Sequence, residues 1–256
     1  MQIHEEPIPE ITLYLQNNGH KTVDDMRGEY DGYMRTIRQF MTVTKETKIL
    51  EIGPGTGWFP LMGQMEGLDV QGVEISPQLV ENAKTWGRSM GIDTNVWLGN
   101  AEEADIGNNE FDAIVANSVF EHIEKWEVAL GRVYKALKPG GIFYFTSTNR
   151  WCPVSYEYPT LCYGWMPDQM RYNYRIKKVG PEIMKLGIDF NQFTYPQLNR
   201  AFTKAGFREI FDRIDMLPEG RFTGLKATAV KIAKSSGLLK WPILTFSDAT
   251  VFVCRK

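Results

Sequence analysis

Cysteine and histidine are scarce in this 256-residue chain, which has three of each. The cysteines, Cys152, Cys162 and Cys254, are odd in number and have no CxxC spacing, so the sequence predicts neither a disulfide framework nor a zinc site. We therefore expect no bound metal. Long apolar runs are also absent, because no stretch approaches eighteen apolar residues, and we expect no stable membrane insertion.

An excess of charge of either sign is missing as well. The chain has 29 Lys and Arg against 31 Asp and Glu, a net charge of -2. Such a balance gives no global field for a polyanion, so we expect no nucleic-acid partner. The start of the sequence shows no basic segment followed by an apolar run, and we expect a cytoplasmic protein. Length and 43% hydrophobic content fit a single packed domain over residues 1–256.

Short apolar runs alternate with helix-like stretches through much of the chain. The runs predict strands, and the stretches between them predict helices at 57–65, 76–90 and 124–137. Right-handed crossovers then give a doubly wound α/β fold with a mostly parallel sheet and helices on both faces. Two later runs, separated from the others by a helix at 194–205, predict an antiparallel edge. The seven predicted strands are 48–53, 69–75, 95–99, 111–117, 141–146, 208–216 and 249–254.

Three segments lie outside this alternation. A helix predicted at 22–41 is expected to cover the ligand crevice. Residues 150–193 are irregular and rich in aromatic side chains, which predicts either a cap inserted over the crevice or a small core of its own. A second insertion at 217–242 holds a basic amphipathic helix with Leu225, Ala229, Ile232 and Ala233 on one face. That pattern fits a surface helix docked on the domain or contact with a membrane surface.

A glycine turn follows the first predicted strand. Gly53, Gly55 and Gly57 are spaced two apart, and glycine lets the backbone approach a ligand closely. The turn therefore predicts a nucleoside site, with a purely structural turn as the alternative. Glu51, just before the turn, repels a pyrophosphate and attracts an amine.

A second carboxylate, Glu74, ends the second predicted strand 21 residues after Gly53. A carboxylate at this place accepts hydrogen bonds from both hydroxyls of a ribose. The dinucleotide pattern GxGxxG is absent, which disfavours a nicotinamide dehydrogenase. A cofactor with a ribose, an ammonium group and no phosphate fits better, and S-adenosylmethionine is such a molecule.

Five sequence motifs, taken in the order in which they occur along the chain, resemble those of a known family. They are ILEIGPGTG at 49–57, GVEIS at 72–76, GNAE at 99–102, FDAIVANSVFEHI at 111–123 and LKPGG at 137–141. With these motifs together, the chain resembles a class I S-adenosylmethionine-dependent methyltransferase of the small-molecule type, similar to ubiquinone-pathway enzymes. The resemblance covers roughly residues 45–210. It implies the seven-stranded Rossmann-like methyltransferase fold and transferase activity.

The resemblance also implies a role for single residues along the cofactor. Glycines of the turn line the methionine part and ribose with Glu51 close by, Glu74 holds the ribose hydroxyls, and an N-terminal helix often covers the cofactor. The residues implied are Gly53, Gly55 and Gly57 in the turn, Ile75 packed on adenine, Asn100 and Ala101 at its edge, Asn117 and Ser118 at the aminoacyl part, and Arg27, Tyr30 or Tyr33 from the covering helix.

His122 is the candidate general base, since its unperturbed pKa of about 6.5 suits proton transfer at neutral pH. The alternative is a histidine that only orders the loop at 118–123. Glu121 either orients His122 or faces water, and Arg171, Tyr172 and Tyr174 are candidates for acceptor contact. We expect a small acceptor of aromatic or lipid-like character. A non-catalytic S-adenosylmethionine-binding or regulatory protein of the same fold is the alternative function.

Overall fold

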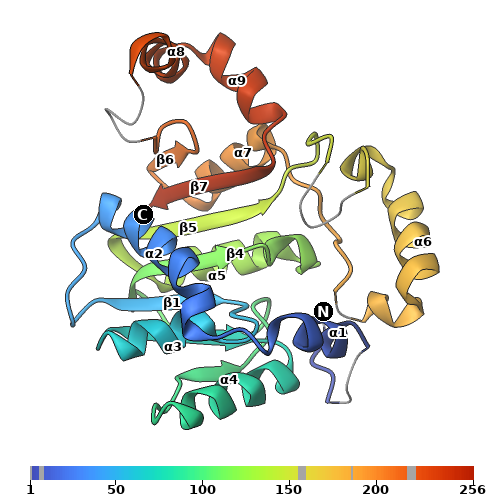
Figure 1. The fold of residues 1–256 in the computed structure, drawn as a ribbon. Helices are drawn as coiled ribbons and strands as arrows, with labels where there is room; N and C mark the ends of the chain where they lie inside the picture. The colour runs from blue at the N-terminus through green and yellow to red at the C-terminus, as the bar shows by residue number, and fades with distance from the viewer. Residues whose placement is uncertain (1, 6–8, 155–159, 186, 218–222) are drawn as a thin grey trace.

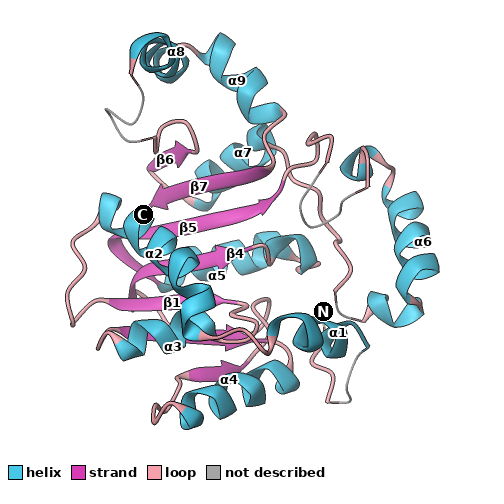
Figure 2. Ribbon diagram, viewed as in Figure 1, coloured by secondary structure: helices cyan, strands magenta, loops and turns pink. Residues whose placement is uncertain are grey.

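A seven-stranded mixed sheet organises the molecule (Figure 1, Figure 2). The computed structural model describes residues 2–5, 9–154, 160–185, 187–217 and 223–256. Strand order is β3-β2-β1-β4-β5-β7-β6, and only β7 runs antiparallel to its neighbours. The strands are β1 Lys48–Ile52, β2 Asp69–Glu74, β3 Val96–Leu98, β4 Phe111–Asn117, β5 Leu137–Thr148, β6 Glu209–Asp212 and β7 Ala249–Arg255.

Helices cover both faces of the sheet, as the sequence predicts, because alternate strand residues point to opposite sides. Leu50 and Ile52 of β1 face α5 and α7, whereas Ile49 faces α2 and α3. The helices are α1 Pro9–Asn18, α2 Val23–Phe40, α3 Trp58–Met65, α4 Pro77–Ser89, α5 Trp126–Ala136, α6 Asp168–Val179, α7 Tyr195–Ala205, α8 Gly224–Ser235 and α9 Gly237–Thr245. Short 3-10 turns are η1 Phe120–His122, η2 Tyr163–Trp165 and η3 Pro181–Met184.

Helix starts follow local capping chemistry. The Thr22 side chain accepts from the Asp25 N–H while Asp25 accepts from the Thr22 N–H, a capping box that begins α2. Ser76 caps α4, and Pro77 occupies its first turn, where no N–H is needed. These are the starts that the sequence signals predict. Among the strands, β5 differs from its predicted bounds. It begins at Leu137 rather than at 141, and its register with β4 shifts between Phe111 and Ala113.

The predicted helix at 22–41 exists but packs elsewhere. Met34 and Ile37 of α2 are buried against α3 and β5, on one face of the sheet. Helix α1, which the sequence reading missed, packs instead on α4 through Ile11, Leu15 and Leu79. The covering position beside the carboxyl ends of the strands therefore belongs to α1 (Figure 1).

Helices also lie in the two later segments outside the predicted alternation, residues 150–193 and 217–242. Helix α6 and η3 lie within residues 150–193, which we call the cap segment, and pack on each other. Helices α8 and α9 occupy much of the second insertion, but the side chains of Leu225 and Ala229 lie outside the described residues. Ala233 is buried and Ile232 is exposed, so the shared apolar face predicted for these two is wrong. Among the described residues, no helix is both long enough and apolar enough to cross a bilayer.

Phenylalanines form the centre of the larger core. Phe145 of β5 is fully buried and contacts Phe120, Phe202 and Phe193 at ring-centroid distances of 5.4, 5.4 and 6.0 Å. Tilted and edge-on aromatic pairs of this kind add to the free energy of burial.

We expect Phe145→Ala to lower the free energy of unfolding by about 3–5 kcal/mol, because it leaves a cavity between strand and helices. Phe246→Ala is the matched control, since Phe246 is 58% exposed, and its expected cost is about 0.5 kcal/mol. Urea denaturation followed by circular dichroism measures both. Equal midpoints for the two variants would contradict this account of the core.

Candidate active site

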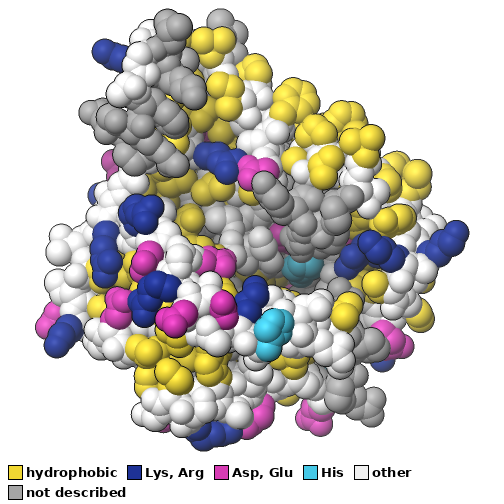
Figure 3. All heavy atoms as spheres, in the orientation of Figure 1, with side chains coloured by type: hydrophobic (Ala, Val, Ile, Leu, Met, Phe, Trp, Pro, Cys, Tyr) yellow, Lys and Arg dark blue, Asp and Glu magenta, His cyan; other side chains and the backbone are white. Residues whose placement is uncertain are grey.

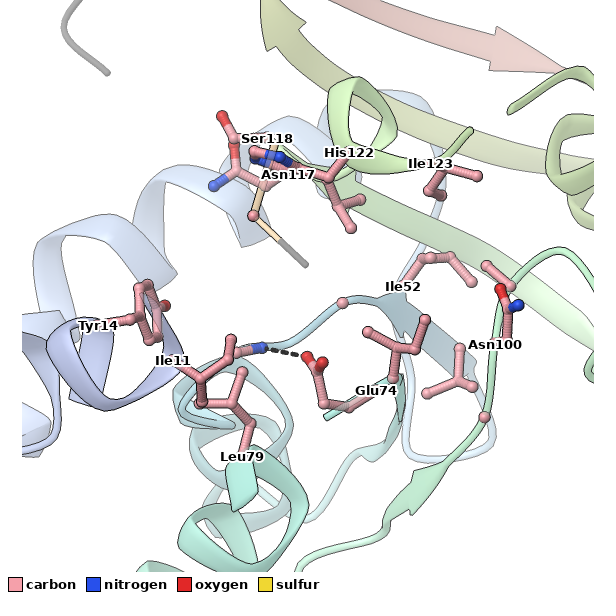
Figure 4. Close-up of a pocket in the computed structure, with 18 of the residues that line it drawn as sticks. Ile11, Tyr14, Ile52, Glu74, Leu79, Asn100, Asn117, Ser118, His122 and Ile123 are labelled. Atoms are coloured by element: carbon pink, nitrogen blue, oxygen red, sulfur yellow. Dashed lines mark hydrogen bonds between the residues drawn. The ribbon is translucent and has the colours of Figure 1, made fainter. Parts of the chain in front are cut away.

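A cavity of about 680 Å³ opens where β1, β2 and β4 end. Parallel strands bring their carboxyl ends to one edge of the sheet, so loops far apart in sequence meet there. Figure 4 shows Glu74, Ile11 and Leu79 on one side of the cavity and Asn117, Ser118 and His122 on the other. Its wall comprises Ile11, Tyr14, Ile52, Gly53, Gly55, Val73, Glu74, Ile75, Leu79, Gly99, Asn100, Ala101, Asn117, Ser118, Val119, His122, Ile123, Arg175 and Gly187.

The glycine turn after β1 forms the floor between these sides. Gly53 and Gly55 have φ angles of 65° and 58°, which favour glycine. A Cβ on Gly55 would come within 2.6 Å of the Tyr14 hydroxyl, so the Tyr14 side chain would have to move aside. Gly57 is not in the wall, and a Cβ there would lie 2.4 Å from Ala83 Cβ of α4. Two of the predicted glycines therefore face the cavity, and the third lets α4 pack closely.

Glu74 is held rigidly at the end of β2. Its Oε2 accepts from the Gly55 N–H at 3.0 Å, and its Oε1 accepts from the Ser76 N–H at 3.0 Å. Burial raises the pKa of Glu74 to about 7, although these backbone hydrogen bonds work in the opposite direction. Each carboxylate oxygen has two lone pairs, so both can still accept a further hydrogen bond from the cavity.

Glu51 lies beneath the turn rather than in the cavity wall. It is buried, and its Oε2 has no hydrogen-bond partner among the described residues. Burial raises the pKa of Glu51 well above its usual value, and the negative charges of Glu29 and Glu74 add to the effect. Carboxyl groups therefore gather at this end of the sheet, and no described cation pairs with Glu51.

The side of the cavity near β2 and β3 is mostly apolar. Ile75, Leu79 and Ala101 line it, together with Asn100. Asn100 is buried, and its Oδ1 accepts from the Glu102 N–H at 3.0 Å, which fixes the orientation of the amide. A flat apolar slot with a fixed polar edge suits a heteroaromatic ring.

The opposite side is built after β4. The Thr146 hydroxyl donates to Asn117 Oδ1, and Ser118 has a φ of 50°, which turns the chain sharply at the strand end. His122 Nδ1 lies 3.0 Å from the Ile188 carbonyl oxygen. Because a carbonyl oxygen only accepts, Nδ1 carries the proton, and Nε2 of the neutral ring is the atom able to take one.

Ten of the nineteen wall residues were not predicted from the sequence, and three of these ten come from helices α1 and α6. Ile11 and Tyr14 come from α1, and burial together with Glu74, Glu51 and Glu29 raises the pKa of Tyr14 to about 12. Arg175 enters from α6 of the cap segment. The Ile11–Leu15 spacing after Pro9 is a weak amphipathic signal for α1, but nothing in the sequence places that helix at the glycine turn.

Other candidates lie away from the cavity. The Tyr30 hydroxyl donates to Glu66 at 3.0 Å, and its ring packs on Phe59, so Tyr30, predicted to contact the cofactor, lies outside the cavity wall. The Arg27 guanidinium also bonds Glu66. Tyr33 packs against α3 and β5 on the same face of the sheet.

The three residues of the cap segment that were predicted to contact the acceptor also lie outside the cavity wall. Arg171 is fully buried and pairs with Asp189 at 2.5 Å, whereas the Tyr172 hydroxyl donates to the Phe190 carbonyl at 3.2 Å. Neither these two nor Tyr174 is in the cavity wall. Glu121 does not face water, because its carboxylate is buried and accepts from the Ser147 hydroxyl at 2.8 Å. Among the described residues, no three His, Cys, Asp or Glu side chains gather in a way that would hold a metal.

The strand order and the cavity at the carboxyl ends define a Rossmann-like methyltransferase fold. Two solved structures share it across most of this chain. A S-adenosylmethionine-dependent methyltransferase from Archaeoglobus fulgidus has a TM-score of 0.56 at 14% identity, covering 96% of this chain and 99% of that one. Phosphoethanolamine N-methyltransferase 2 from Haemonchus contortus, solved with S-adenosyl-L-methionine, has a TM-score of 0.58 at 17% identity, covering 96% of this chain and 60% of that one.

Sequence comparison matches part of the chain to known proteins. Residues 50–145 match the methyltransferase domain family. A ubiquinone biosynthesis O-methyltransferase from Paramagnetospirillum magneticum is 26% identical over 148 residues, 56% of this chain and 58% of the relative. A demethylmenaquinone methyltransferase from Thermus thermophilus is 28% identical over 96 residues, 37% of this chain and 44% of the relative. The chain spans about half the length of the curated relatives it matches. Over residues 50–145 the chain therefore matches a methyltransferase domain, the class that the sequence motifs predict.

The buried charge of Glu51 predicts a gain in stability when it is removed. A carboxyl whose pKa is raised on folding destabilises the folded state increasingly as pH rises above the unfolded value. We therefore expect Glu51→Gln to raise the melting temperature of the ligand-free protein at pH 8 by about 2–4 °C, the shift that about 1 kcal/mol produces at this size. The gain should shrink at pH 5, and the exposed control Glu103→Gln should show none. A lower melting temperature for Glu51→Gln than for the wild type at pH 8 would contradict the destabilising role of Glu51.

Glu74 predicts a pH-dependent affinity for a ribose. Ribose hydroxyls donate to the ionised carboxylate, and with a pKa of about 7 ionisation rises from about a tenth at pH 6 to about nine-tenths at pH 8. The dissociation constant of 5′-methylthioadenosine, which carries no ionisable amine, should fall roughly tenfold over this range. Calorimetry measures it. Glu74→Gln should bind weakly and independently of pH, and a wild-type affinity unchanged between pH 6 and pH 8 would sink the assignment.

Proposed function

We propose that this protein transfers a methyl group from S-adenosylmethionine to a small-molecule acceptor. One observation carries the proposal: a single cavity joins the Gly53–Gly55 turn and the fixed Glu74 carboxylate to His122 on the facing side. That arrangement provides a nucleoside site and a proton acceptor with room between them. A cytoplasmic location, expected from the sequence, belongs to the same proposal.

The cofactor would be held by groups already in place. Glu74 accepts from the ribose hydroxyls, Ile75 and Leu79 provide an apolar wall for adenine, and Asn100 presents the polar edge. The Gly53–Gly55 backbone leaves space for the methionine part, which leads towards Asn117 and Ser118. Glu51 is buried just before the turn. A negative charge on its carboxylate would attract the ammonium group of the cofactor.

The cofactor supplies a methyl group on a sulfonium, whose positive charge disappears when the methyl leaves. The acceptor forms a bond to that methyl carbon as the carbon–sulfur bond breaks, giving the methylated acceptor and S-adenosylhomocysteine. An acceptor hydroxyl also loses a proton, which His122 Nε2 takes while the Ile188 carbonyl holds the ring through Nδ1–H. Positioning of the two reactants in the cavity would provide most of the rate enhancement, since effective molarities for oriented reactants reach about 10⁵ M or more.

An apolar aromatic or lipid-like acceptor fits best. The cavity wall beyond the cofactor groups contains Val119 and Ile123. Relatives named for ubiquinone biosynthesis and for demethylmenaquinone point in the same direction. We therefore propose a hydroxylated aromatic or quinone-like acceptor, with no nucleic acid. A non-catalytic binding protein is less favoured, because both the glycine turn and Glu74 are kept.

The proposal predicts release of S-adenosylhomocysteine that depends on an added hydroxylated aromatic. With an active acceptor from a panel of catechols and hydroquinones, His122→Ala should lower kcat by about 10²–10⁴-fold, because a general base is lost. The KM for S-adenosylmethionine should stay nearly unchanged, since Glu74 and the turn are intact.

Loss of a hydrogen bond to a charged group costs about 1.5–3 kcal/mol, so Glu74→Ala should weaken cofactor binding about 10–100-fold. Glu103→Ala serves as the control for both assays. Failure of the folded wild-type protein to bind S-adenosylhomocysteine in calorimetry would refute the function. Retention of full kcat in His122→Ala would refute only the role of His122.

A further inference from the structure

Exposed apolar side chains gather in the cap segment and in residues 223–247. Eleven of the eighteen large exposed hydrophobic residues described lie in 150–193 and 223–247. These ranges make up about a quarter of the chain, so the concentration is well above an even spread, and apolar patches of this kind mark interaction sites. The residues are Trp151, Val154, Leu161, Trp165, Met170, Met184, Ile232, Leu239, Trp241, Ile243 and Phe246.

Helix α9 presents a stripe. Leu239, Ile243 and Phe246 are spaced four and three residues apart, which places them on one side of a helix. They are 51, 55 and 58% exposed, whereas Leu244 is buried in the core. The lysine of this helix, Lys240, bonds Asp212 and Asp215 and so anchors α9 to the domain. The stripe thus faces outward on a firmly attached helix.

The cap segment extends this apolar area. Figure 3 shows hydrophobic side chains running from the region of α9 across towards the cap and α6, on one side of the molecule. Trp151 and Trp165 pack edge to face at 5.9 Å, and both remain exposed. We call the surface made by α6, α9 and residues 151–154 and 160–167 of the cap the α9–cap face.

Charge identifies what this face would bind. Residues 150–193 and 223–247 contain ten Lys and Arg against four Asp and Glu, although the whole chain has a net charge of -2. Lys177, Lys178 and Lys231 are exposed, while Asp189 is buried with Arg171 and Glu182 pairs with Lys185. Protein–protein interfaces are depleted in Lys, whereas exposed Trp beside Lys is typical of a surface that binds anionic lipid.

We propose that the α9–cap face docks on an anionic lipid bilayer, with Leu239, Ile243 and Phe246 entering the headgroup boundary and the lysines facing lipid phosphates. Docking is peripheral and needs no spanning helix. The cap also contributes Arg175 and Gly187 to the cavity wall, so the bound face adjoins the site. A docked protein could therefore take a lipid-soluble acceptor directly from the bilayer, a consequence that rests on the proposed function.

Flotation with phosphatidylcholine vesicles, with and without an equal share of phosphatidylglycerol, tests the docking. The full chain should float with the anionic vesicles and bind neutral ones roughly tenfold or more weakly. Raising the salt from 0.05 to 0.5 M should release it in part. The triple variant Leu239→Ser, Ile243→Ser, Phe246→Ser should lose binding about tenfold or more. A triple variant at exposed residues elsewhere, Met90→Ser, Leu98→Ser, Val128→Ser, should bind like wild type.

Binding of 5′-methylthioadenosine, measured on each variant, separates this proposal from the function of the cavity. Unchanged nucleoside affinity with lost flotation supports docking through α9. The proposal is overturned by a wild-type protein that does not float, by equal flotation of the two triple variants, or by a wild-type dimer that the α9 substitutions dissociate without any vesicle binding. The last outcome would make the face a protein interface.

Discussion

The Glu74 carboxylate connects the parts of the site. It accepts N–H groups from Gly55 after β1 and from Ser76 at the start of α4, so one side chain fixes two neighbouring loops relative to the sheet. The left-handed turn gains its geometry from glycine, and the carboxylate holds it in place. Helix α1 can then approach the turn through Tyr14. Without this link, three elements that form the nucleoside half of the cavity would have no common anchor.

Periodicity was sufficient to predict the sheet, because buried parallel strands and capped helices follow local rules that Lys48–Ile52 and Ser76–Pro77 illustrate. Glycine spacing and the position of Glu74 likewise predicted that Gly53, Gly55 and Glu74 meet at one site, and all three line the same cavity. The covering elements were harder. Tyr30 and Ile11 both sit in amphipathic stretches, and only the packing of α2 on α3 decides which helix is left to cover the turn. Arg175 was missed for a related reason: Arg171, one helical turn earlier, looks the same in sequence, yet one side chain lines the cavity and the other is neutralised in the cap.

The cap segment is ordered by a buried ionic network rather than by a large apolar core. Asp189 accepts from Arg171, from the Tyr163 hydroxyl at 2.7 Å and from Gln192 at 2.8 Å. Breaking such a network leaves a buried charge, so its members hold α6 and residues 187–193 in one arrangement. The Ile188 carbonyl, next to Asp189, is the atom that contacts His122. The tautomer of His122 therefore depends on how the cap is held.

The surroundings of the cavity disfavour the ionised forms of its carboxyl groups. Glu51 and Glu74 are both buried and both disfavour ionisation, and Tyr14 lies beside them with a raised pKa. Ionising Glu51 in the folded protein therefore costs free energy, since no described cation pairs with it. A ligand with an ammonium group and ribose hydroxyls relieves it, because the charge gains a counter-ion and the carboxylate of Glu74 gains donors. Part of the affinity for such a ligand thus comes from strain already present in the free site, and a neutral nucleoside would recover only the part that belongs to Glu74.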